Sequence, residues 1–122
     1  MDKTFELKLA FCTCPNCYFV PSRYRSNNNL ALKIESEDEG SICVCTVNPD
    51  KKLSDDVICI KDYSENEGMA EFLKNMGIIG DRVEVIPSGW VELYVYELTE
   101  YGKEIFKSVW VLSEHFKIVS YN

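Results

Sequence analysis

Histidine is almost missing from this chain, which contains one, His115. A serine or cysteine triad needs a nearby base, and a single histidine close to the C-terminus makes such a triad a poor expectation. The chain also has no G-x-G-x-x-G, no Walker loop, no H-E-x-x-H and no calcium-binding loop. Glu65 and Glu67 would diverge by about 200° on a helix, so they do not form an acid–base pair. The sequence therefore predicts a non-enzymatic protein.

Basic residues are also scarce, with 13 Lys and Arg against 20 Asp and Glu, for a net charge of −7. Proteins that bind nucleic acids generally need clustered cations to displace counterions. The basic cluster here is Arg23 and Arg25, on both sides of Tyr24. General nucleic-acid binding is therefore not expected. The two arginines are candidate contacts for a partner. The acidic charge suits a partner with a basic surface, or simply keeps the protein in solution.

Long apolar runs are missing as well. No stretch approaches the roughly 20 residues of a membrane-spanning helix. Residues 1–11 carry an acid early and have no long apolar segment, so a signal peptide is not expected. We therefore expect a cytoplasmic protein with no membrane partner. The 122 residues suit one domain, 1–122.

The clearest positive feature is the stretch 64–77, SENEGMAEFLKNMG. Ser64 and Glu67 have capping-box spacing. The apolar residues that follow share one face of a helix, and they are Met69, Phe72, Leu73 and Met76. Gly77 supplies a left-handed stop, so a helix is predicted over 64–76. Gly68 inside this helix has two alternative explanations: a neighbouring strand packs closely against it, or its bare backbone faces a ligand.

Alternating apolar residues and turn signals predict strands in most of the remaining chain. The expected strands are 4–11, 30–34, 41–47, 57–60, 82–86 and 90–98, with a loop at 12–29. A short helix capped by Thr99 follows, and then an extended segment. The predicted fold is α+β: a single domain with a mostly antiparallel sheet and the 64–76 helix packed on one face.

Six cysteines are many for a chain of this length. The C-x-x-C spacing within CTCPNC lets two thiolates bind one zinc ion. The two side chains of a C-x-C pair on a later strand point to the same face of the sheet. The candidate zinc ligands are Cys12, Cys14, Cys17, Cys43 and Cys45. For Cys43 and Cys45 the alternative is packing in the core as small hydrophobes, which is also the prediction for Cys59. For the cysteines of the CTCPNC loop the alternative is plain free thiols. Apart from this structural zinc, no cofactor is expected.

Two regions are candidates for partner contacts. The first is the start of the central helix, at Glu65, Asn66 and Gly68. The second is a set of aromatic residues on one strand, where an exposed sheet face can form a binding platform or an oligomer contact. These aromatics are Trp90, Tyr94 and Tyr96.

Several segments resemble an uncharacterised family of small proteins from Firmicutes-type bacteria, their phages and mobile elements. They are T-V-N at 46–48, I-K-D-Y-S-E-N-E-G-M at 60–69, F-L at 72–73 and G-I-I at 77–79. The resemblance covers roughly residues 24–98, while CTCPNC and the tail after Leu98 depart from it. It implies no established chemistry. It implies a context in which small acidic proteins block a host defence enzyme or sequester its signalling nucleotide.

Three hypotheses follow. The leading one is a non-enzymatic binding protein, an anti-defence factor that blocks a host defence protein. The second is a homo-oligomeric sponge that stacks a small nucleotide between subunits. The third is a zinc-stabilised adaptor built on the cysteines.

Overall fold

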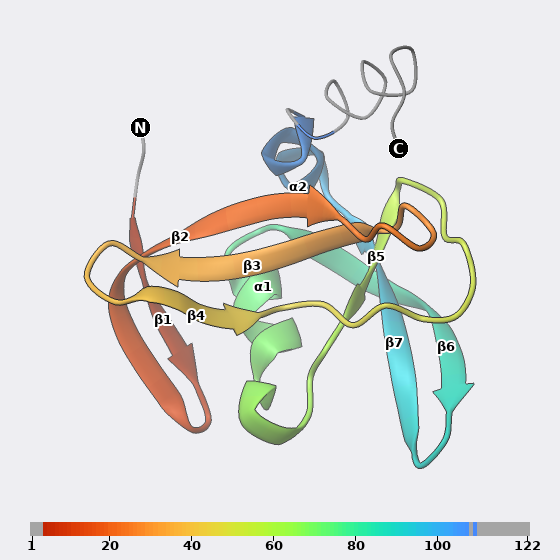
Figure 1. Cartoon of the computed structure of the whole chain (residues 1–122), viewed down its shortest axis with the longest axis horizontal. Coiled ribbons are helices and arrows are strands. Elements are labelled where there is room, and N and C mark those ends of the chain that lie inside the picture. The colour runs from red at the N-terminus through yellow and green to blue at the C-terminus, as the bar shows by residue number, and fades with distance from the viewer. Residues whose placement is uncertain (1–3, 108, 110–122) are drawn as a thin grey trace.

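The described residues form two antiparallel sheets and short helices (Figure 1). The structure is a computed structural model, and it describes residues 4–107 and 109. The first sheet has the order β1-β2-β3-β4, with bounds Phe5–Leu9, Cys12–Arg23, Leu30–Ser36 and Gly40–Val44. The second has the order β5-β7-β6, with bounds Val57–Ile60 for β5, Ile79–Ser88 for β6 and Val91–Leu98 for β7. The helices are η1 (Ser64–Asn66), α1 (Met69–Asn75) and α2 (Glu100–Ile105).

The predicted α+β class and antiparallel pairing are confirmed, but the strands divide into two sheets. The sheets are connected through the residues that follow β4. Thr46 forms an isolated bridge with Ile60, the backbone N–H of Cys45 donates to the Leu32 carbonyl, and the N–H of Lys61 donates to the Cys45 carbonyl. One short segment thus hydrogen-bonds to β3 on one side and to the end of β5 on the other.

The loop predicted at 12–29 is wrong for most of its length, because residues 12–23 form β2. Pro15 and Pro21 suggested a break in the chain, since proline cannot donate to a central ladder. However, the two halves of β2 pair with different neighbours. The first half pairs with β1 and the second with β3, and Cys17 pairs with both Phe5 and Ser36. Each proline therefore lies where β2 is paired on one side only. Pro15 lies in the half paired with β1, and Pro21 lies in the half paired with β3.

The predicted 64–76 helix is also divided, into η1 and α1. The expected capping box does not form, because Ser64 has φ +59° and no side-chain cap precedes η1. Gly68 is the N-cap of α1 with φ +99°, a conformation that side chains disfavour. A Cβ there would lie 3.5 Å from the backbone nitrogen of Ala10, an ordinary contact distance. Backbone conformation, more than close packing, therefore explains this glycine.

The predicted helix ends are confirmed at Gly77 and Thr99. Gly77 has φ +81°, and its N–H donates to the Lys74 carbonyl at 2.9 Å. Thr99 Oγ1 accepts from the Gly102 N–H at 2.9 Å and caps α2. The extended segment predicted after this helix lies outside the described residues, as does His115.

Helix α1 contacts β1 of the first sheet and β6 of the second, so it lies between the sheets (Figure 1). Its predicted apolar face is confirmed: Met69 and Leu73 are buried, and Phe72 and Met76 pack against the same core cluster. A second, smaller cluster lies on the other face of the second sheet, around Leu93 and Val95. The two clusters hold the β6–β7 hairpin at its base and leave its far end projecting (Figure 1).

Candidate functional site

The three residues predicted at the start of the helix differ in accessibility. Glu65 is exposed, and its carboxylate forms an ion pair with Lys61 at 2.6 Å. Asn66 is only 1% exposed, and its Nδ2 donates to the Val44 carbonyl at 2.7 Å. Asn66 thus anchors η1 to the end of β4, and a partner does not reach its side chain in this conformation.

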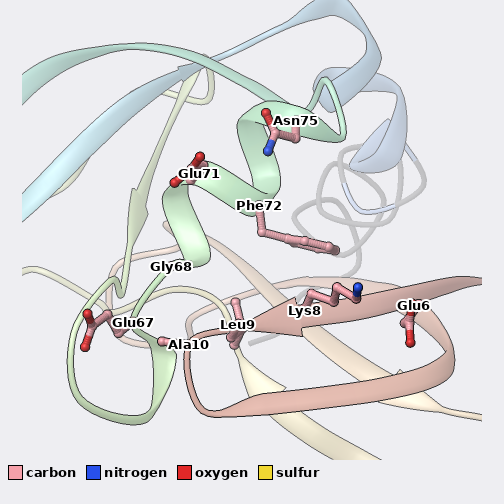
Figure 2. A pocket seen from close by; sticks show the side chains of 9 residues that line it. All are labelled: Glu6, Lys8, Leu9, Ala10, Glu67, Gly68, Glu71, Phe72 and Asn75. Carbon is pink, nitrogen blue, oxygen red and sulfur yellow. The ribbon is translucent and has the colours of Figure 1, made fainter.

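Gly68 lines a shallow cleft between β1 and α1, with a volume of about 520 Å³ (Figure 2). Leu9 lines it from β1, and Phe72 reaches from α1 toward β1. The lining residues are Glu6, Lys8, Leu9, Ala10, Glu67, Gly68, Glu71, Phe72 and Asn75. Three carboxylates and one ammonium group surround an open depression, which brings no pair of reactive groups together.

The three aromatic residues predicted as a platform do not form one. Trp90 is fully exposed at 103% in the turn between β6 and β7, whereas Tyr96 is 7% exposed and belongs to the main core cluster. Tyr94 is half-buried, and the Arg82 guanidinium lies 4.7 Å from its ring centroid. Of these aromatic rings, the Trp90 indole is the one fully available to a partner.

Sequence reasoning missed the apolar residues that accompany Trp90 on the hairpin. Val83, Val85 and Val91 have exposed side chains. The alternating pattern placed these residues on strands, but alternation alone does not show which parts of a sheet extend beyond the core. Four carboxylates and one guanidinium share the 79–98 segment with them, so the hairpin carries exposed apolar side chains and a net negative charge.

Arg23 and Arg25 do not act as one basic patch. The Arg23 guanidinium forms a two-point contact with Asp55, both hydrogen bonds measuring 3.0 Å, and also donates to the Asn28 carbonyl. The side chain of Arg23 is only 9% exposed. Arg25 lies on the surface. Arg23 therefore has a structural role, joining the end of β2 to the loop before β5.

The five cysteines proposed as zinc ligands belong to one region of the structure. Cys14, Cys17 and Cys45 are buried in the main core cluster, and half-buried Cys12 and Cys43 pack against it. Asn16, between Cys14 and Cys17, has φ +58°, and both of these thiols lie inside. The sixth, Cys59, is buried in the smaller cluster. It packs as a small hydrophobe, as predicted.

These thiols influence one another. Burial and the neighbouring Cys14 thiol raise the pKa of Cys17 to about 11. The neighbouring Cys45 thiol lowers the pKa of Cys43, and burial raises the pKa of Cys45 well above its usual range. Burial also raises the pKa of Cys12, and the neighbouring Cys43 adds to this shift.

Within residues 4–107 and 109, no three His, Cys, Asp or Glu side chains are arranged to hold a metal ion. The structure therefore adds no ligand set to the zinc hypothesis, which stays a prediction.

Comparisons of the chain with protein-family models, with curated proteins and with solved structures find no match. The resemblance to small phage and mobile-element proteins stays a prediction. In the part of the chain that the structure describes, every helix is too short or too polar to cross a bilayer.

Proposed function

We propose that this chain is a cytoplasmic, non-enzymatic protein-binding module, and that it uses the tip of the β6–β7 hairpin to block a host defence protein. The observation that carries this proposal is the full exposure of Trp90, with the exposed Val91 next to it in the chain. Tryptophan is strongly enriched among the residues that dominate binding energy at protein interfaces. An indole left fully in water has no role in the core of this domain.

The hairpin is suited to binding through its side chains. An exposed edge strand can also recruit a partner by backbone pairing. Here the register of β6 shifts on both sides of Arg82, and Pro87 lies further along the strand. Bulges and proline are features that protect edges from such pairing. The partner surface we propose is therefore an apolar pocket that receives the indole.

The charge of the hairpin indicates which residues of the partner should border the pocket for the indole. Glu92 and Glu97 are exposed, while Glu84 is paired with Lys51 and Arg82 lies over Tyr94. The net negative charge of the hairpin and the chain charge of −7 favour encounter with a basic surface. We propose a partner whose pocket is bordered by lysine or arginine.

The test uses the native chain, Trp90→Ala and a matched control, Tyr101→Ala, which removes an exposed aromatic ring from α2. Partners captured from a Firmicutes-type host lysate by the native chain are purified, and their affinities are measured. Trp90→Ala should weaken binding by about thirtyfold, since truncating a dominant interface residue removes about 2 kcal/mol or more. Tyr101→Ala should bind normally. Equal affinity of the native chain and Trp90→Ala would overturn the hairpin as the binding site.

The anti-defence role has a separate test in cells that carry the captured defence protein. Expression of the native chain should restore phage plating, and expression of Trp90→Ala should not. If neither affects plating while binding is intact, the chain is a binding module without this role.

The nucleotide-sponge hypothesis is distinguished by native mass spectrometry of protein purified without chelator. An organic ligand bound to a symmetric oligomer would replace the protein-blocking proposal. A mass increase equal to zinc would support the adaptor hypothesis, and chelation should then unfold the protein.

A further inference from the structure

Strand β1 is an edge of the first sheet, and the side of it that faces away from β2 borders the cleft. Among the described residues it pairs with β2 alone, and the cleft lies between β1 and α1 (Figure 2). Just after the strand, the Ala10 N–H points away from β2 and donates to the Glu67 carbonyl at 3.0 Å. Because backbone groups alternate in direction along a strand, those of Lys8 and Glu6 point the same way. This edge therefore presents backbone donors and acceptors to a further strand.

We propose that β1 pairs in antiparallel fashion with β1 of a second copy of this chain, about a two-fold axis at Leu7. In such a symmetric dimer the same surface of both subunits forms the interface. The two four-stranded sheets join into one continuous sheet. None of the residues involved belongs to the β6–β7 hairpin, so this inference stands independently of the surface proposed for binding a defence protein.

The charges of β1, with sequence FELKL, are complementary to themselves about Leu7. Antiparallel pairing centred on this residue sets Glu6 opposite Lys8 of the partner subunit, and by symmetry this contact occurs twice. Both side chains are exposed, and neither forms an ion pair with another described residue. Opposite charges directly across two strands stabilise the pairing, whereas like charges oppose it. The charge pattern of this strand therefore favours its own copy as the partner.

The apolar face of β1 fits the same register. Leu7 is buried, while Phe5 and Leu9 on its two sides are half-buried. Pairing about Leu7 sets Phe5 opposite Leu9 of the partner subunit, so each half-buried side chain meets an apolar neighbour. Phe72 is also half-buried and lines the cleft, and its ring centroid lies 5.7 Å from that of Phe5. Covering these side chains adds a hydrophobic contribution to the backbone hydrogen bonds.

The remaining sheet edges are less suited to pairing. The Val44 carbonyl at the end of β4 accepts from Asn66 Nδ2, the end of β5 is bridged to Thr46, and β6 has two register shifts and a proline. The register shift between β1 and β2 places two β2 residues opposite Glu6, so the extra residue is in β2. Bulges, prolines and lysines protect edge strands. In β1 the one such feature is Lys8, whose charge is offset in the dimer.

The test reverses charges in the full chain and measures the dimer dissociation constant by analytical ultracentrifugation over a dilution series. The native chain should dimerise. Glu6→Lys and Lys8→Glu each turn two attractive pairs into two repulsive ones, so each should raise that constant by about tenfold or more. The variant with both substitutions should regain the native value. Lys33→Glu is the matched control, because it reverses an exposed charge on the inner strand β3, and it should dimerise normally.

A mixture of the two single variants gives a second readout by native mass spectrometry, with one variant labelled with nitrogen-15. In a heterodimer of Glu6→Lys with Lys8→Glu, both cross-strand contacts join opposite charges. The heterodimer should therefore exceed either homodimer. Far-ultraviolet circular dichroism verifies beforehand that each variant is folded, so that a loss of dimer reports on the interface.

A native chain that stays monomeric at every concentration would overturn the proposal, whether another segment covers β1 or its edge stays free. A native dimer that neither reversal weakens would place the interface elsewhere. Weakening by both single reversals with no recovery in the double variant or in the mixture would overturn the register about Leu7, and with it the pairing proposed here.

Discussion

The Asp62 carboxylate accepts a hydrogen bond from the Gly68 backbone N–H at 2.9 Å. This contact spans η1 and attaches Asp62, two residues before that turn, to the N-cap of α1. It satisfies the N-cap N–H, the donor that a capping box assigns to its glutamate. A carboxylate near the N-terminus of α1 also interacts favourably with the helix dipole.

Asp62→Ala should destabilise the protein by about 1 kcal/mol, the usual effect of losing a capping side chain. Urea denaturation followed by circular dichroism measures the change. The control is Asp81→Ala, which removes an exposed carboxylate from β6. Equal unfolding midpoints for Asp62→Ala and the native chain would show that the cap is unimportant.

Gly102→Ala should destabilise the protein more strongly. A Cβ at this position would overlap the backbone carbonyl oxygen of Ile78, so α2 would have to move from its place over the chain that precedes β6. Forcing extra atoms into a packed site typically costs about 1–3 kcal/mol. Thermal melts compare this variant with Glu104→Ala, an exposed change on the same helix. Similar melting temperatures for both would contradict the packing of α2 described above.

Asn29→Asp should cost about 2 kcal/mol or more, since it places a carboxylate against oxygen acceptors in the interior. Asn29 is 3% exposed, and its Nδ2 donates to Asn48 Oδ1 and to the Lys51 carbonyl. Its Oδ1 accepts from the Leu53 N–H at 2.7 Å. The exposed Asn75→Asp is the matched control. A denaturant midpoint unchanged by Asn29→Asp would refute this role for the buried amide.

Stability should decline as the pH rises from about 9 to 11. Burial raises the pKa of Cys59 from 9.0 to about 11 in the folded protein. A raised pKa means that the stabilising contribution is complete below pH 9 and is lost as the pH approaches the folded value. Thermal melts across this range should fall less steeply for Cys59→Ala than for the native chain. Parallel curves would show that Cys59 does not contribute.

The sequence by itself determined the elements whose local signals agree. The apolar face of α1, the left-handed stop at Gly77, the Thr99 cap and the short strand β5 all lie where spacing and turn chemistry placed them. In each case the deciding interactions involve neighbours within one or two turns or strand pairs.

Only the tertiary structure decided the remainder. Pro15 and Pro21 suggested a loop, but β2 changes its partner from β1 to β3 at Cys17, so each proline lies where only one side of the strand is paired. Asn66, which resembled a surface residue, became buried by bonding to β4, while Trp90 was left in water by the projection of its hairpin. Whether a side chain is buried or exposed depends on which distant segments pack over it, and local sequence patterns do not contain that information.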